Sequence, residues 1–351
     1  MPQLTPFTIL VLAAGKGTRM RSSRAKVLHE VFHVPMIHHV LHAVLPLEPS
    51  RAIVIVGHQQ EEVRKVLQDF PVEFVTQEKQ LGTGHAVLAT ESVLADIEGV
   101  VMIVCGDTPL VRPSTLQEMR RQHLESQATL TLMTTVLDNP TNYGRILNNG
   151  NGGVAGIVEE KDASPEQKAI REINAGIYCV DKKFLFQALH QVGTENSQGE
   201  MYLTDIVALA VTAGYCVERY FTSAAQDVLG VNSRVELAAA HMEIQRRRNI
   251  GLMQQGVSMH NPESVIVSAE SAIGRDSLLM AGVQILGSSR IGEACRIEPG
   301  VILKDCAVGD NVVIGPYSCM EACSIPNGTV VGPYCREYTR DRTMLLSAEQ
   351  S

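Results

Sequence analysis

The sequence has less positive than negative charge, and this shortage excludes one large class of functions. Its 351 residues carry 38 Asp plus Glu against 30 Lys plus Arg, which gives a formal net charge of −8. A surface that binds nucleic acid must neutralise many phosphates, so we expect no nucleic-acid partner. Small anionic ligands remain open, because a few local cations suffice to bind them.

Long apolar runs are also absent. None approaches the roughly 18 residues that a membrane span needs, and the first residues lack the basic stretch that precedes the apolar segment of a signal peptide. We therefore expect a cytoplasmic protein with no membrane partner.

Cysteine pairs with metal-ligand spacing are missing as well. The eight cysteines form no CxxC motif, and the closest two are Cys319 and Cys323. Zinc sites and disulfide frameworks have characteristic spacings that this set lacks, so we expect reduced thiols with a structural role.

The apolar content that is present is enough for two domains. With 45% hydrophobic and 19% charged residues, the chain is not disordered. Up to about residue 230, short runs rich in Val and Ile alternate with stretches of helical period, which predicts an α/β fold with a mostly parallel sheet. The expected strands are 8–13, 52–56, 72–76, 100–105, 129–136, 177–180 and 217–221, and the expected helices are 36–45, 61–68, 83–94, 114–125, 182–189 and 203–212.

The pattern changes after residue 232. Ser233 and Glu236 have the spacing of a capping box, and the polar helical pattern that follows contains three arginines, 246–248. We expect these arginines on a solvated helix face, with an anion site as the alternative. The expected organisation is a first domain over 1–232, a connecting helix and linker over 233–262, a repeat domain over 263–336 and a tail over 337–351.

The repeat domain has a period of six. A six-residue rung repeated three times makes one triangular coil, whose aliphatic side chains point inward and stack on those of the next coil. This segment resembles the left-handed parallel β-helix of the hexapeptide-repeat family, whereas a β-sandwich would have a period of two. Gly274, Gly292 and Gly309 are one coil apart, so we expect positive φ at these corners. The stacked aliphatic positions, a little under four coils, are Ile273, Leu279, Ile285, Ile291, Ile297, Leu303, Val308, Ile314, Met320, Ile325 and Val331.

A glycine-rich loop, residues 15–20, follows the first expected strand. Such a loop brings backbone N–H groups close to a phosphate, but it lacks the Gly-Lys-Ser/Thr of a Walker loop, and Met20 stands where dinucleotide-binding loops have a third glycine. Five cations lie in or just after it, and open α/β sheets bind ligands at this edge, so we expect an anion site instead of a solvated surface loop. The cations are Lys16, Arg19, Arg21, Arg24 and Lys26.

Asp107 follows the expected buried strand 100–105 and precedes Thr108-Pro109. A carboxylate at the end of a central strand suits Mg²⁺, which needs few protein ligands when phosphate and water complete its shell. A turn-forming or capping Asp is the alternative. His38 and His42 also share a helix face, but no third ligand lies nearby, so we expect an exposed face and no metal there.

Nine motifs in order carry a resemblance to a known family. Segments 12–20, 26–28, 81–86 and 106–110, together with Gln77, resemble the sugar-phosphate nucleotidyltransferases. Further segments narrow the match to the uridyltransferase half of the bifunctional bacterial enzyme that makes UDP-N-acetylglucosamine. These segments are 143–146, 157–162, 172–176, 199–205 and 231–232.

The resemblance implies a Rossmann-like nucleotidyltransferase domain followed by the β-helix, and it implies roles for individual residues. Leu12, Ala14, Gly15 and Lys26 would bind the nucleotide, and Gln77 and Gly82 would contact the uracil edge with Thr83 beside them. Arg19 and Lys26 would hold the phosphates and act in catalysis. Gly144, Glu159 and Asn174 would contact the amino sugar, and Asp107 and Asn232 would bind Mg²⁺. Thr108 and Met201 depart from the family pattern, and Met201 is expected to alter the packing of Glu200 and Tyr202 near the sugar.

The implied reaction joins UTP and N-acetylglucosamine 1-phosphate. The sugar phosphate attacks the α-phosphorus of UTP directly, so positioning and charge neutralisation replace a protein nucleophile. A different sugar 1-phosphate and nucleotide pair, or a non-catalytic sugar-nucleotide sensor, remains open. We do not expect acetyl transfer, because no histidine follows His260 to act as a base, and we expect the short β-helix to form a homotrimer.

Overall fold

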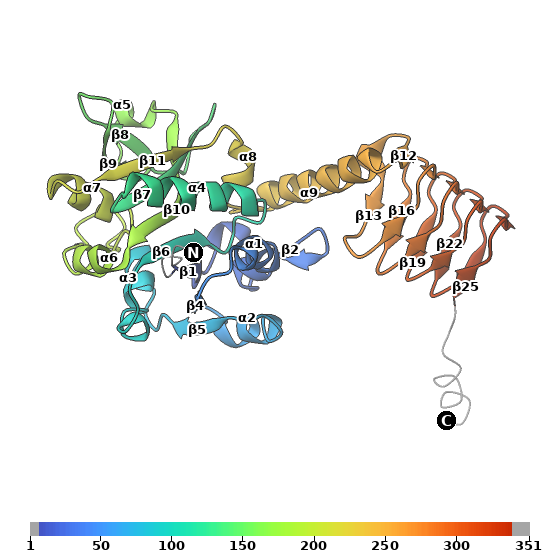
Figure 1. Ribbon diagram of the computed structural model, residues 1–351, viewed down its shortest axis with the longest axis horizontal. Helices are drawn as coiled ribbons and strands as arrows, with labels where there is room; N and C mark the ends of the chain where they lie inside the picture. The colour runs from blue at the N-terminus through green and yellow to red at the C-terminus, as the bar shows by residue number, and fades with distance from the viewer. Residues whose placement is uncertain (1–6, 339–351) are drawn as a thin grey trace, which may run out of the picture. The chain divides into compact units, whose positions relative to one another are not determined.

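The apolar runs before residue 230 form one nine-stranded sheet (Figure 1). The computed structural model describes residues 7–338, and the chain divides into two units, Met1–Leu237 and Ala238–Ser351. Along the sheet the order is β11-β7-β10-β6-β1-β4-β5, with β8 and β9 attached to β10. The strands of this unit are β1 (Phe7–Ala13), β2 (Glu30–Val31), β3 (Val34–Pro35), β4 (Arg51–Val56), β5 (Glu73–Thr76), β6 (Val100–Cys105), β7 (Leu130–Val136), β8 (Arg145–Asn148), β9 (Val154–Val158), β10 (Glu172–Asp181) and β11 (Val217–Phe221).

The sheet is mostly parallel, as predicted. β1 pairs in parallel with β4 and with β6, and β4 pairs in parallel with β5. β10 is antiparallel to both of its neighbours, β6 and β7. Because β10 alone reverses direction along this row, the carboxyl ends of β1 and β6 lie side by side at one edge.

Helices cover both faces of the sheet (Figure 1). Ile9 and Val11 pack into one apolar core and Leu10 packs into the other, as the alternation of side chains along a strand requires. The helices are α1 (Met36–Val44), α2 (Gln60–Val66), α3 (Thr83–Leu88), α4 (Pro113–Ser126), α5 (Pro165–Lys168), α6 (Lys182–Leu189), α7 (Asp205–Thr212), α8 (Ala225–Val228) and α9 (Arg234–Gln254).

Three local predictions were wrong in this unit. The helix expected over 83–94 ends at Leu88, and a separate 3-10 turn follows at Ser92–Leu94. Strands β8 and β9 were not predicted, because the segment is short and rich in Asn and Gly. Strand β10 begins at Glu172 and not at 177, because Asn174 and Gly176 interrupt the apolar pattern where the strand has an irregular register.

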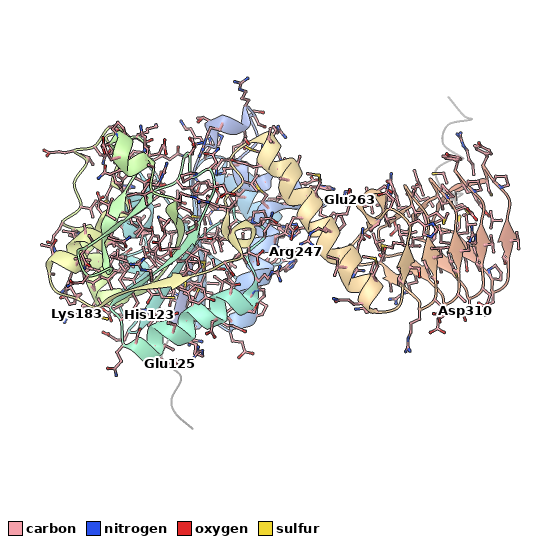
Figure 2. All side chains as sticks on the ribbon, turned by 90° about the horizontal axis from the view of Figure 1, so that it is seen from above. His123, Glu125, Lys183, Arg247, Glu263 and Asp310 are labelled. Carbon is pink, nitrogen blue, oxygen red and sulfur yellow. The ribbon has the colours of Figure 1, made fainter. Side chains whose placement is uncertain are left out.

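The start of α9 uses a variant of the predicted capping box. Ser233 Oγ accepts a hydrogen bond from the Glu236 backbone N–H at 3.2 Å, but Glu236 Oε2 accepts from the backbone of Asn232 and not of Ser233. The expected solvated arginines are also partly engaged. Arg247, labelled in Figure 2, pairs with Glu243, and Arg248 donates to the Ser271 carbonyl.

The C-terminal unit is the predicted parallel β-helix. Its strands form three sheets with a register of 18 and then 17 residues, as in Ile273↔Ile291 and Ile291↔Val308. Nine of the eleven predicted aliphatic positions are buried, and Ile273 and Val331 are partly buried at the two ends. The strands are β12 (Ser258–Met259), β13 (Ile266–Val267), β14 (Ala272–Ile273), β15 (Leu278–Leu279), β16 (Gln284–Leu286), β17 (Arg290–Ile291), β18 (Arg296–Ile297), β19 (Ile302–Lys304), β20 (Ala307–Val308), β21 (Val313–Ile314), β22 (Cys319–Glu321), β23 (Ser324–Ile325), β24 (Val330–Val331) and β25 (Arg336–Tyr338).

Two strands extend this stack beyond its expected limits. β12 pairs with β15 although it precedes residue 263, and β25 pairs with β22 although it runs past residue 336. Side chains also connect the coils. Asp310, labelled in Figure 2, accepts from the Glu293 N–H at 2.8 Å, and its own N–H donates to Asn327 Oδ1 at 2.9 Å. The predicted tail over 337–351 lies outside the described residues from 339 onward.

The predicted role of the corner glycines was wrong. Gly274, Gly292 and Gly309 do not have positive φ; near two of these corners the positive φ belongs to Asp276 and Ala294, at 61° and 54°. The glycines are needed for space instead. A Cβ on Gly274 would lie 2.5 Å from the Gly292 backbone, and one on Gly292 would lie 2.6 Å from the Gly309 backbone.

All eight cysteines lie within residues 7–338 and outside any disulfide, as expected. Cys216 is exposed, whereas the other seven are buried or partly buried. Over the same part of the chain, no helix combines the length and apolar character that crossing a bilayer requires.

Candidate active site

The glycine-rich loop brings the end of β1 against Lys26. Gly17 has a φ of 64°, and a Cβ there would lie 2.6 Å from Lys26 Cβ, so only glycine fits this close approach. The Gly106 N–H donates to the Leu12 carbonyl at 2.9 Å, which joins this loop to the segment that follows β6.

Four polar side chains from three distant segments converge at this edge. Lys26 Nζ donates to Asp107 Oδ2 and, at 2.5 Å, to Asn232 Oδ1. Arg19 Nη2 donates to the same Asn232 oxygen at 2.8 Å. The Val231 N–H donates to the Asp107 carbonyl at 2.8 Å. This bond holds the segment that carries Asn232 beside the segment that carries Asp107.

The donor set at this point fits a divalent cation. Asp107 Oδ2 and Asn232 Oδ1 both bond to one ammonium nitrogen, so the two oxygens are near enough to converge on a single cation. Carboxylate and amide oxygens are the hard ligands that Mg²⁺ prefers. The side chain of Asp107 is 20% exposed, which leaves room for further ligands from solvent or substrate.

The other loop cations do not join this cluster. Lys16 and Arg21 are exposed, and Arg24 lies 3.5 Å from Glu30. Thr108, the departure beside Asp107, is buried, and its hydroxyl donates to the Cys105 carbonyl at 2.7 Å. It therefore closes the turn that carries Asp107.

The residues expected along the nucleotide lie on two linked segments. Leu12, Ala14 and Gly15 form the end of β1 and the start of the loop, and Gln80 Nε2 donates to the Ala14 carbonyl at 3.0 Å. Gln77 is buried, and its Nε2 donates to the Gly82 carbonyl at 3.0 Å.

Gly82 and Thr83 lie against the segment that carries Met201. Gly82 has a φ of 110°, and a Cβ there would lie 2.5 Å from the Met201 carbonyl oxygen. Thr83 Oγ1 accepts from the Leu203 N–H at 3.1 Å. Since Met201 makes the first contact through its backbone, the side chain at this position does not determine that contact.

The three residues expected at the sugar also come together. The Asn174 N–H donates to the Gly144 carbonyl at 2.9 Å, and a Cβ on Gly144 would lie 3.5 Å from Glu159 Oε1. Burial raises the pKa of Glu159, and a hydrogen bond from the Thr204 hydroxyl at 3.0 Å acts in the opposite direction. A pocket of about 420 Å³ opens beside Glu159. Its other polar and charged lining residues are Asp162, Glu195, Asn196, Tyr202 and Asp205.

Sequence reasoning assigned no role to three further residues that lie near these groups. Thr204 bonds to Glu159, and Tyr178 accepts a hydrogen bond from Asn174 at 2.6 Å. Burial raises the pKa of Tyr143 to about 12, and the nearby charges of Glu236 and Asp107 add to the rise, so its phenol stays neutral next to the cation cluster. All three stand within or next to the family motifs, but a motif does not indicate which of its residues supports another.

The histidine pair expected to carry no metal is held by other contacts. The rings of His38 and His42 are 6.5 Å apart, and each packs against Phe70. The prediction of an exposed face is wrong for His38, which is half-buried because it packs on Phe70, and its Nε2 lies 3.2 Å from the Val66 carbonyl oxygen; His42 is exposed as predicted. Within residues 7–338 no group of three or more His, Cys, Asp or Glu side chains is arranged to hold a metal.

Comparisons with known proteins match both units. The MobA-like NTP transferase domain family matches residues 9–146, and the bacterial transferase hexapeptide family matches residues 288–322. "Bifunctional protein GlmU" of Desulfotalea psychrophila is 52% identical over 87% of this chain and 90% of its own length. Proteins of the same name from Halalkalibacterium halodurans and Syntrophotalea carbinolica are each 44% identical over 86% of this chain, which spans 66% and 65% of their lengths.

Proposed function

The chain belongs to the family of the bifunctional protein GlmU, and from this premise we propose that its N-terminal unit transfers UMP from UTP to N-acetylglucosamine 1-phosphate. The products are UDP-N-acetylglucosamine and pyrophosphate. One observation supports the proposal most strongly: in an acidic chain, Arg19 and Lys26 meet Asp107 and Asn232 at the carboxyl ends of β1 and β6.

The chemistry needs no nucleophile from the protein. A phosphate oxygen of the sugar 1-phosphate attacks the α-phosphorus of UTP, the bond to the β-phosphate breaks, and pyrophosphate leaves with the electron pair. Because the sugar 1-phosphate and UTP are both anions, the height of the barrier depends on aligning the two phosphates and on neutralising their charge. Arg19 and Lys26 would supply positive charge at this edge of the sheet, and their shared contact with Asn232 supports this role.

Membership of this family implies a divalent metal, and we propose that the ion is Mg²⁺. Asp107 and Asn232 would hold it through the two oxygens that converge on one nitrogen. When bound, it would neutralise part of the triphosphate charge.

The substrate preference follows from the two recognition segments. Gln77 and Gly82 would read the edge of uracil, and their mutual hydrogen bond fixes the orientation of the Gln77 amide. Gly144, Glu159 and Asn174 would contact the amino sugar, and their proximity supports a single sugar subsite. A sugar without the acetamido group would leave part of this buried polar set without a partner.

A matrix of nucleoside triphosphates against sugar 1-phosphates tests the function, with pyrophosphate release measured with and without Mg²⁺. We expect the highest rate for UTP with N-acetylglucosamine 1-phosphate, and loss of the rate when EDTA removes the metal. A higher rate for another pair would overturn the substrate assignment. Binding of UDP-N-acetylglucosamine without any pyrophosphate release would favour a sensor.

We also propose that the chain forms a homotrimer through its β-helix. The coil presents flat faces, and a triangular element packs readily about a threefold axis. Light scattering after gel filtration should give three times the chain mass of 38.2 kDa at micromolar concentration, whereas a monomer would contradict the proposal.

A further inference from the structure

The strand that carries Asn174 is irregular at that residue. The register between β10 and β7 shifts between Asn174 and Tyr178, and Gly176 has a φ of 72°. In a regular strand, residues four positions apart are separated by about 13 Å. The bulge shortens this separation and re-aims the side chains on either side of it.

Because of the bulge, Asn174 and Tyr178 are hydrogen-bonded. Asn174 Nδ2 donates to the Tyr178 hydroxyl oxygen at 2.6 Å, and Asn174 Oδ1 accepts from the Gly176 N–H at 3.0 Å. The reverse orientation of the amide would place its NH₂ group against the Gly176 N–H. The two bonds therefore allow one orientation of the amide and leave one N–H and one lone pair for a ligand.

The surroundings of Tyr178 keep this bond intact. Tyr178 is 2% exposed and Asn174 is 8% exposed, so water does not compete well for either group. Burial raises the pKa of Tyr178 well above its usual value, and the charge of Glu159 adds to the rise. The phenol is accordingly neutral at any pH at which the enzyme would be assayed.

We propose that Tyr178 is a positioning residue that sets the preference for a 2-acetamido sugar 1-phosphate over the 2-hydroxy analogue. It acts through Asn174, whose fixed amide presents a donor and an acceptor beside Glu159 to the acetamido group. A hydroxyl group carries its donor and acceptor on one oxygen, whereas an acetamido group carries them on two separate atoms, N–H and C=O. The smaller group therefore leaves part of the fixed amide without a partner, and a polar site discriminates against such a ligand. The proposal rests on the uridyltransferase function proposed above.

The first test is Tyr178→Phe, which removes the hydroxyl and keeps the ring. We expect kcat/KM for N-acetylglucosamine 1-phosphate to fall roughly tenfold, mainly through KM, as loss of one buried hydrogen bond predicts. For glucose 1-phosphate and for UTP the change should stay within about twofold, so the preference between the sugars falls. Tyr220→Phe, at a half-buried tyrosine on β11, is the matched control and should leave the preference unchanged.

A double-mutant cycle separates positioning from a general structural effect. In an Asn174→Ala background, Tyr178→Phe should have no further effect on the preference, because the residue through which it acts is gone. An equal loss for both sugars with a lower melting temperature, or a preference unchanged by Tyr178→Phe, would overturn the proposal.

A crystal structure of the Tyr178→Phe protein gives a reading that does not depend on activity. We expect the Asn174 side chain to leave its position or to take a second orientation. An Asn174 amide held as before would overturn the proposal even if the wild-type protein is an active uridyltransferase. If the wild-type protein releases no pyrophosphate from any pair, the proposed function fails, and the preference assigned to Tyr178 fails with it; a displaced Asn174 would then support the positional contact alone.

Discussion

In the N-terminal unit, polar side chains from remote segments meet at one sheet edge, whereas in the β-helix polar side chains meet residues about one coil away. The hydrogen bonds of Lys26 and Arg19 to Asn232 span 206 and 213 residues. Those of Asp310 to its two neighbouring coils each span 17 residues.

Buried hydroxyl groups in the two units also bond to different kinds of partner. In the β-helix, Ser277 donates to the Gly292 carbonyl and Ser318 donates to the Gly332 carbonyl, so each hydroxyl satisfies the backbone of the next coil. In the N-terminal unit, the Thr204 hydroxyl donates to Glu159, a group offered to a ligand. These hydroxyls of the β-helix therefore stabilise the stacked coils. The Thr204 hydroxyl of the N-terminal unit instead orients a side chain that would bind a ligand.

The largest effect should come from removing a charge at the converging site. We expect Asp107→Ala or Lys26→Ala to lower turnover about a hundredfold to a thousandfold, because each removes electrostatic stabilisation of the reacting phosphates. Lys26 would supply positive charge to them directly, and Asp107 would hold the cation that does so. Steady-state pyrophosphate release measures this effect, with circular dichroism to check the fold. The matched control is Lys304→Ala, which removes an exposed ion pair with Glu321 in the β-helix and should leave turnover unchanged. Near-normal turnover in either site variant would remove that residue from the mechanism.

A core substitution in the β-helix should have the opposite pattern. Ile297 is fully buried between Leu279 and Ile314 of the adjacent coils. We expect Ile297→Ala to lower the free energy of unfolding of this unit by about 3 kcal/mol through the cavity it leaves, with turnover per folded molecule unchanged. Urea unfolding measures the loss, and the exposed Val330→Ala serves as the control. A loss no larger than that of Val330→Ala would contradict the stacked core.

A smaller effect should separate backbone strain from displacement of Lys26. Both Gly17 and Gly214 have positive φ, at 64° and 76°, but a Cβ meets Lys26 at Gly17 and open space at Gly214. Alanine at either position costs about 1–2 kcal/mol of strain. We expect kcat/KM to fall about tenfold for Gly17→Ala and to be unchanged for Gly214→Ala. Equal activity of the two variants would show that the contact with Lys26 does not matter.

The smallest effect concerns the acid stability of α9. Hydrogen bonds from Arg246, and then from Arg247, lower the pKa of Glu243 to about 2 from an ordinary value of 4.5. A lowered pKa stabilises the folded state above pH 4.5, and this contribution is lost as the pH falls from 4.5 toward 2. We expect Glu243→Gln to cost about 1 kcal/mol at pH 7 and nothing near pH 2. Melting curves at several pH values measure the difference, and a cost independent of pH would contradict the assignment.

The contrast in span also explains how far sequence reasoning reached. The six-residue period placed the inward aliphatics of the β-helix, from Leu279 to Ile325, because each contact repeats at a fixed spacing. The prediction of a positive φ was wrong at Gly274. Glycine is required both where φ is positive and where a Cβ would clash with the next coil, and the sequence alone does not distinguish the two causes. In the N-terminal unit, apolar periodicity predicted β1 and β6 and therefore the edge at which Arg19 and Asp107 lie.

Contacts that do not repeat at a fixed sequence spacing could not be predicted from the periodicity. The bond between Asn174 and Tyr178 depends on a bulge, and a bulge at Gly176 interrupts the very pattern by which a strand is predicted. The position of Asn232 beside Lys26 came from family resemblance and from no local signal, since two segments 206 residues apart share no spacing rule.

The most direct test of the account is a crystal structure of the full chain with UTP and Mg²⁺. We predict density for the triphosphate beside Arg19 and Lys26, and a metal ion bound by the side chains of Asp107 and Asn232. A nucleotide bound elsewhere, with this edge of the sheet empty at saturating UTP and Mg²⁺, would contradict the central claim that the converging charges form the catalytic site.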